Sequence, residues 1–173
     1  MIFMQKGFVT LEIILAIMII GVLMKFAVPK AAQVIDTAAL DYETKRFYSE
    51  LRFVQAMSKS SPTGIKGTGN ANLVTAPPIL FINRTENYYQ VFKSANTFID
   101  KPIREPHYFS NGVTFKLYSG TAPTITIKFD SEGKAKINNN GNSETLVFTS
   151  RFGKNKYIRF DSVGRIRGSL NAQ

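Results

Sequence analysis

The sequence predicts an α+β fold in which one long amino-terminal helix is packed by a carboxy-terminal antiparallel β domain. Three observations lead to this prediction. An apolar run near the amino terminus is long enough to cross a membrane as a helix, and helical spacing of apolar residues then continues to about residue 60. Beyond residue 76, short runs alternate apolar with polar residues between Gly, Asn and Pro. The 173-residue chain is therefore expected to form one domain and an anchor.

The apolar run from Phe8 to Val28 is the first element. As a helix its roughly 21 residues span about 31 Å, and the hydrocarbon core of a bilayer is about 30 Å thick. Lys25 lies near the far end, from which a long side chain reaches the interface, whereas Glu12 lies inside the run. A carboxylate there costs roughly 2.5–3.5 kcal/mol on insertion scales, so we expect Glu12 to meet a cation on another copy of the helix.

Two other interpretations of this segment remain open. A secretory signal peptide fits poorly, because the stretch before the run is very short, with Lys6 as its only charge. No site after the run offers small residues at the two positions that signal peptidase reads. An unrelated single-span anchor is the second alternative, and it predicts an uncleaved chain that begins at Met1 or Met4.

The segment KGFVTLE at residues 6–12 resembles the class III leader of type IV pilins and type II secretion pseudopilins. The resemblance implies that a prepilin peptidase cuts after Gly7 and methylates the new amino terminus at Phe8. It also implies that Glu12 meets the Phe8 amine of a neighbouring subunit. The protonated amine would supply the cation that the Glu12 carboxylate needs inside an apolar helix.

This resemblance implies a pilin-like fold and a structural function, as a minor pilin or pseudopilin of a type IV pilus, competence or type II secretion filament. The chain would cross the bacterial inner membrane once, with a cytoplasmic amino terminus, and then join other pilins in an extracytoplasmic filament. The expected parts are a leader at 1–7, a transmembrane half-helix at 8–28, a soluble half-helix at 29–60 and a β-rich domain at 61–173. Many major pilins close a terminal loop with a disulfide, so the absence of Cys favours a minor pilin or pseudopilin.

The second half of the helix is expected to follow a kink at Pro29, which lacks an amide N–H. Gly21 and Pro29 also fall where pilins commonly carry helix-weakening residues. Apolar residues at mostly helical spacing predict a spine helix that reaches Ser60 and packs on the β domain. They are Ala31, Val34, Ala38, Tyr42, Phe47, Leu51 and Val54. The segment Tyr48–Met57 resembles the GspH/FimT branch of minor pilins, and a loop is expected to follow through residue 76.

The β domain is predicted from eight short runs of strand-like pattern. They are Ile79–Asn83, Tyr88–Lys93, Val113–Tyr118, Thr124–Phe129, Lys134–Ile137, Thr145–Thr149, Lys156–Phe160 and Arg165–Leu170. The segment 98–109, which contains two prolines, is expected to be a connection or a short edge strand. The runs are expected to form about two small antiparallel sheets.

One stretch occurs twice, as IKFDSEGKAK at 127–136 and as IRFDSVGRIR at 158–167. Each copy has Asp at the first turn position and Gly at the fourth, which suits a type I turn followed by a left-handed Gly and predicts a β-hairpin. Alternation places apolar side chains on one face and basic ones on the other. The apolar residues are Ile127, Phe129, Ala135, Ile158, Phe160 and Ile166, and the basic ones are Lys128, Lys134, Lys136, Arg159, Arg165 and Arg167.

The terminal GRIR at residues 164–167 is similar to the Gly-Arg-x-Arg element of the T-type minor pilins of natural transformation, which is implicated in DNA binding. The net charge of +10 is compatible with an anionic partner, such as nucleic acid, lipid headgroups or cell-wall polymer, but for a basic domain in general a solvated basic surface is the more common explanation. The candidate phosphate-binding residues are Arg159, Arg165, Arg167, Lys154 and Lys156. Turn chemistry alone is the alternative, because the first hairpin repeats the pattern as Gly-Lys-Ala-Lys.

No residue pattern predicts catalysis. The sequence has no Cys, no Trp and one His, His107, and it has no carboxylate cluster or nucleophile constellation. We therefore expect a structural protein without enzyme activity, cofactor or metal site.

Overall fold

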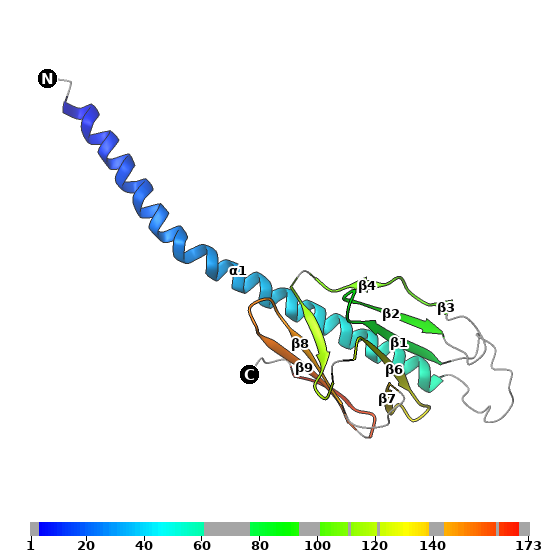
Figure 1. Cartoon of the computed structure of the whole chain (residues 1–173). Helices are drawn as coiled ribbons and strands as arrows, with labels where there is room; N and C mark the ends of the chain where they lie inside the picture. The colour runs from blue at the N-terminus through cyan, green and yellow to red at the C-terminus, as the bar shows by residue number, and fades with distance from the viewer. Residues whose placement is uncertain are drawn as a thin grey trace.

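The computed structural model describes residues 4–60, 77–93, 101–110, 112–120, 122–138, 144–161 and 163–169. Within these ranges the chain forms the helix α1 (Met4–Ser60) and ten strands. Figure 1 shows α1 extending far beyond the β domain, which packs on its carboxy-terminal half. The strands are β1 (Pro78–Asn83), β2 (Tyr88–Lys93), β3 (Lys101–Pro102), β4 (His107–Tyr108), β5 (Thr114–Leu117), β6 (Thr124–Phe129), β7 (Ala135–Ile137), β8 (Thr145–Thr149), β9 (Asn155–Phe160) and β10 (Ile166–Ser169).

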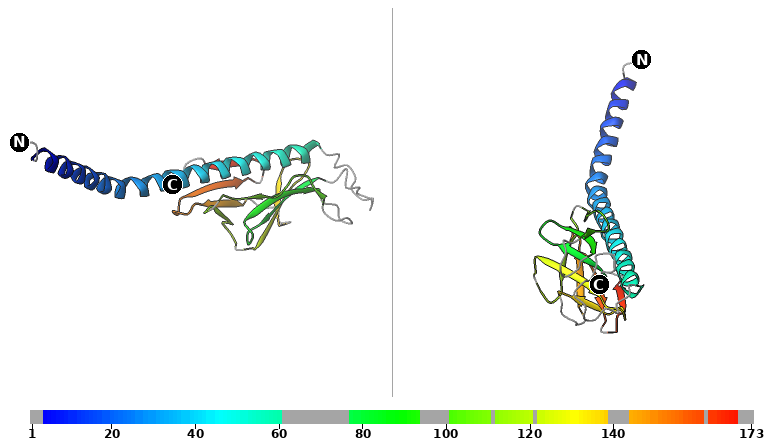
Figure 2. Two further views of the ribbon diagram at one scale, coloured as in Figure 1. Left: turned by 90° about the horizontal axis from the view of Figure 1, so that it is seen from above. Right: turned by 90° about the vertical axis from the view of Figure 1, so that its right-hand side faces the viewer.

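α1 is one continuous helix with Pro29 inside it. Its axis bends between the projecting first half and the packed second half (Figures 1 and 2). Proline removes one amide donor and crowds the preceding turn, which accounts for a bend without a break. The helix begins at Met4, four residues before the predicted start at Phe8.

The packed face of α1 differs from the predicted one before residue 43. Ala31, Val34, Ala38 and Tyr42 are exposed, so their prediction as packing residues is wrong. The face that meets the sheets includes charged residues in this part of the helix, so apolar spacing alone does not identify it. This buried stripe begins at Asp36 and includes the predicted Phe47, Leu51 and Val54. Its other buried members are Leu40, Glu43, Thr44, Gln55 and Ser58.

Two antiparallel sheets pack on the second half of α1, which confirms the predicted α+β fold. One sheet has the order β3-β2-β1-β6-β7, with β4 also paired to β2, and the other has the order β10-β9-β8-β5. α1 contacts β1 and β6 of the first sheet and β8 and β9 of the second. Figure 2 shows that the first half of the helix is free of both sheets.

The strand boundaries agree with the eight predicted runs to within one residue over the described part of the chain. The segment predicted as a connection or edge strand supplies two short strands, β3 and β4, at the edge of the first sheet. Residues 98–100 of that segment and residues 61–76 of the predicted loop lie outside the described residues.

The core lies between α1 and the inner faces of both sheets. Phe47 is fully buried, and its ring centroid lies 5.1 Å from that of Tyr89 on β2 and 5.2 Å from that of Phe148 on β8. Burying one such side chain contributes about 1.5–3 kcal/mol, and the ring contacts add to this. One helical residue thus joins the two sheets.

Candidate functional site

The first half of α1 presents apolar side chains on every side. From Phe8 to Ile35 every residue except Ala32 is exposed, and Phe8 is 81% exposed. Among the described residues, α1 is the one helix that is long and apolar enough to cross a membrane, and none of its apolar window is buried. Such a surface requires lipid or other helices around it.

Glu12 and Lys25 are the charged residues of the run from Phe8 to Val28. Both are exposed, and neither has a hydrogen-bond or ion-pair partner within the part of the chain that the structure describes. Glu12 is thus available to a partner in another chain, as the leader resemblance implies. Its pairing with the Phe8 amine stays a prediction.

Both copies of the sequence repeat form hairpins, one from β6 and β7 and one from β9 and β10. Gly133 N donates to Asp130 O at 2.9 Å in the first turn, and Gly164 N donates to Asp161 O at 3.0 Å in the second. Gly133 has φ of 81° and Gly164 has φ of 84°, the left-handed conformation that favours glycine. The predicted apolar faces are buried in both hairpins.

The two turns meet at one side chain of α1. Gln55 Nε2 donates to Gly133 O at 2.8 Å and to Gly164 O at 2.7 Å. A Cβ atom at Gly164 would lie 2.6 Å from Gly133 O, so the two turns are in close backbone contact. The helix therefore positions both hairpins, including the one that carries the terminal arginines.

Three of the five predicted basic residues are exposed together on the second hairpin. Arg159 of β9 and Arg167 of β10 are directly paired across the two strands, and both are exposed. Arg165, which is also exposed, directly precedes β10. Arg167 lies 4.0 Å from the Asp161 carboxylate, at a distance that leaves its guanidinium largely accessible. These groups form the arginine surface, defined as Arg159, Arg165 and Arg167.

Lys154 and Lys156 instead contact α1. Lys156 is buried, and its Nζ lies 2.5 Å from Asp41 Oδ1. Lys154 Nζ donates to Thr37 Oγ1 at 2.8 Å. Breaking this pair would leave the buried ammonium of Lys156 without its counter-ion, so Lys156 is held inside the protein and does not join the arginine surface.

Asp36 fastens the turn between β8 and β9 to the helix. Arg151 N donates to its Oδ1 at 3.1 Å, and Phe152 N donates to its Oδ2 at 3.3 Å. Burial by itself would raise the pKa of Asp36, but the bonds from Ser150 and the two backbone amides, with Lys154 nearby, hold that pKa below its ordinary value of 3.8.

The strap, residues 101–110, is held on α1 by two carboxylates two helical turns apart. Glu43 is buried, and its Oε2 lies 2.8 Å from His107 Nε2. Glu50 Oε1 accepts a bond from Arg104 at 2.5 Å. His107, which has no evident partner in the sequence, thus attaches the strap to the helix.

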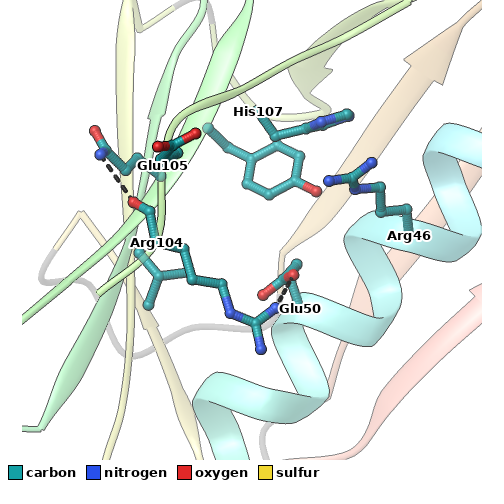
Figure 3. Close-up of a pocket in the computed structure, with 8 residues that line it drawn as sticks. Arg46, Glu50, Arg104, Glu105 and His107 are labelled. Carbon is teal, nitrogen blue, oxygen red and sulfur yellow. Dashed lines mark hydrogen bonds and ion pairs between the residues drawn. The ribbon is translucent and has the colours of Figure 1, made fainter. Parts of the chain in front are cut away.

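A cavity of about 190 Å³ lies between α1, β2 and the strap (Figure 3). Arg46, Glu50, Arg104 and Glu105 contribute two charges of each sign to its lining, and Glu50 and Arg104 are already paired. Burial raises the pKa of Tyr89, which also lines the cavity, and the guanidinium of Arg46 opposes that shift. The cavity has no excess charge and is smaller than the roughly 300–1,000 Å³ of common ligand pockets.

Asp36, Glu43 and Gln55 are contact residues that were not predicted from the sequence. A signal was present, because all three fall at helical spacing with Phe47 on the buried stripe. Polar side chains on a packing face are almost always hydrogen-bonded, so each position indicates a contact with the β domain. The spacing does not indicate which residues of the β domain are the partners.

No family model and no curated protein matches the chain. Among solved structures, the minor pseudopilin EpsH from the Type 2 Secretion System of Vibrio cholerae is similar, with a TM-score of 0.52 and 11% sequence identity. The similarity covers 74% of this chain and 94% of that chain. At this identity the likeness shows the fold, and it confirms the pilin-like arrangement of a long amino-terminal helix packed by antiparallel sheets.

Proposed function

We propose that the chain is a structural subunit of a pilin-like filament, as a minor pilin or pseudopilin of a type IV pilus or type II secretion-like machine. One observation carries the proposal. An uncovered apolar half-helix projects from a β domain that has the fold of a minor pseudopilin, and the carboxylate near its start has no partner among the described residues. The function is assembly, and the chain catalyses no reaction.

The proposed route begins in the inner membrane, which the helix crosses once with its amino terminus in the cytoplasm. A prepilin peptidase cuts after Gly7 and methylates Phe8, and the apolar half-helices then leave the lipid and pack against those of other pilins. Glu12 meets the Phe8 amine of a neighbour. The KGFVTLE leader and the lack of a partner for Glu12 within the described chain support this route. A buried ion pair of this kind specifies the register more than it stabilises the assembly.

Substitution of Glu12 tests the assembly function. Glu12→Ala is expected to insert in the membrane normally but to enter filaments about tenfold less, because the Phe8 amine of the neighbour loses its partner. Immunoblots of sheared filaments and of membranes measure both quantities. Ile13→Ala, which truncates the next side chain and keeps the carboxylate, is the matched control.

Normal incorporation of Glu12→Ala would refute the proposed register contact. Mass spectrometry of the unaltered protein in the same fractions is expected to find methylated Phe8 at the amino terminus. A chain that begins at Met1 or Met4 would support the unrelated membrane anchor instead.

DNA uptake is a second candidate function, and the exposed cross-strand pair Arg159–Arg167 favours it. Two guanidinium groups on neighbouring strands grip phosphates without reading sequence. We expect Arg165→Gln/Arg167→Gln to weaken binding to double-stranded DNA at least tenfold and to reduce the salt slope by about 1.8. Mobility shifts of the detergent-solubilised full chain over a salt series measure this.

The first hairpin supplies the matched control, since Lys134→Gln/Lys136→Gln removes two exposed charges from the equivalent positions. Equal losses in the two double variants would mean that binding depends on diffuse charge. No binding at low salt would exclude the DNA-uptake function and leave the structural one.

A further inference from the structure

Lys25 has no partner in the assembly contact proposed above. In lipid its long side chain extends to the interface. Among packed helices that route is blocked by neighbouring side chains, and the ammonium then needs an anion at the same depth. Lys25 is exposed and unpaired within the described part of its own chain, so the anion must come from elsewhere.

The same helix carries a suitable anion at a fixed offset. Glu12 lies thirteen residues before Lys25, which corresponds to about 20 Å along a helix axis and about 140° around it. The two charges cannot meet within one copy at this separation. Two parallel copies displaced by about 20 Å bring Glu12 of one to the level of Lys25 of the other.

We infer that Glu12 of one copy pairs with Lys25 of a second copy of this chain, displaced by about 20 Å along the helix axis. Charge complementarity at a single spacing identifies the second copy as the partner. Each copy presents its carboxylate and its ammonium on nearly opposite sides, so the contact is heterologous. A heterologous contact that includes a translation does not close, and it therefore propagates into an open assembly.

The inference rests on the proposed function in that it requires packed helices, and it adds a second contact to Glu12. A carboxylate has about four lone-pair sites, so Glu12 can accept from the Phe8 amine of one neighbour and from Lys25 of another. The two contacts require different displacements, about 6 Å for Phe8 and about 20 Å for Lys25. Cross-links at the two displacements distinguish them.

The chain has no cysteine, so introduced cysteines report single contacts. Two differently tagged full-length copies are co-expressed in a bacterial membrane, one with Leu15→Cys and the other with Val28→Cys. These residues are level at the displacement of about 20 Å, and each lies one turn after its charge. We expect a mixed disulfide dimer. The pair Leu11→Cys and Leu15→Cys reports the displacement of about 6 Å.

Charge reversal in both copies tests the pairing itself. Glu12→Lys alone and Lys25→Glu alone are each expected to lower the 15–28 cross-link about tenfold, because like charges then meet, and the double reversal is expected to restore it. Lys25→Met removes the charge without adding another, so it lowers this cross-link with insertion unchanged. Lys30→Glu, a reversal just beyond the apolar run, leaves it unchanged.

The inference is overturned if Lys25→Met or either single reversal leaves the 15–28 cross-link unchanged in membrane-inserted protein. It is also overturned if the double reversal stays at the level of the single ones. A chain that forms the 11–15 cross-link but never the 15–28 cross-link refutes the Lys25 contact and leaves the proposed function standing. Absence of both cross-links in the chain with native charges contradicts both proposals.

Discussion

Gly164 and Gly153 have the same left-handed backbone conformation but different neighbours. Their φ angles are 84° and 79°. A Cβ at Gly153 would meet nothing within 4 Å, whereas a Cβ at Gly164 would lie 2.6 Å from Gly133 O. A side chain at either position would be strained by the left-handed backbone conformation. At Gly164 it would also clash with the backbone of the neighbouring hairpin turn.

Alanine at these two glycines separates the two effects. Gly153→Ala is expected to lower the free energy of unfolding by about 1 kcal/mol, the penalty of one left-handed residue. Gly164→Ala is expected to lower it by about 2–4 kcal/mol, because the turns must also move apart and weaken their bonds to Gln55. Urea unfolding of the detergent-solubilised chain measures both. Equal losses would show that the turns separate freely.

At the scale of elements, the hairpin of β8 and β9 is attached to α1 through polar groups of one short helical segment. Asp36 accepts from two amides of the turn, Thr37 accepts from Lys154, and Asp41 pairs with the buried Lys156. These contacts hold the hairpin against the helix. They engage Lys154 and Lys156, which by charge alone would be predicted to bind an anion. Lys154 and Lys156 are thereby kept off the arginine surface.

The attachment at Asp36 is expected to depend on pH. Its pKa is lower in the folded protein than in the unfolded chain, so its contribution is fully present above the ordinary value of 3.8 and is lost as the pH falls through the folded value. Asp36→Asn is therefore expected to cost about 1–2 kcal/mol at neutral pH and progressively less below about pH 4. Unfolding curves of both proteins at several pH values measure this. A difference that stays constant down to pH 3 would contradict it.

At the scale of the whole molecule, the two halves of α1 have separate roles. The first half touches no other described element and presents an apolar surface outward, while the second half carries the core of the β domain. Figure 2 shows the first half projecting alone from the domain. The surface proposed for assembly and the core of the fold thus lie on different stretches of one helix, joined near Pro29.

This separation predicts that the β domain does not need the projecting half-helix for its stability. A chain of residues 31–173 is expected to unfold at the same temperature as the full chain in detergent, because the packed stripe begins at Asp36. Differential scanning calorimetry of the two proteins measures this. A fall of several degrees in the shorter chain would show that the projecting half also stabilises the fold.

The helix, the strands and the turns of this protein follow from local features of its sequence. The length of the apolar run, the helical spacing, the strand runs and the two Asp-to-Gly turns were all predicted close to where the structure has them. These features are local, because helix and strand periodicity and turn chemistry depend on residues only a few positions apart. The leader and Glu12 are equally local, and their roles in processing and assembly stay predictions.

The buried face of α1 and the set of exposed basic residues depend instead on packing between distant parts of the chain. Ala31, Val34, Ala38 and Tyr42 have a suitable spacing but face outward, and Lys156 has a suitable charge but pairs with Asp41. Such outcomes depend on which distant segment lies opposite each side chain. Burial and ion pairing are set by contacts across more than a hundred residues of chain, and no local pattern specifies them.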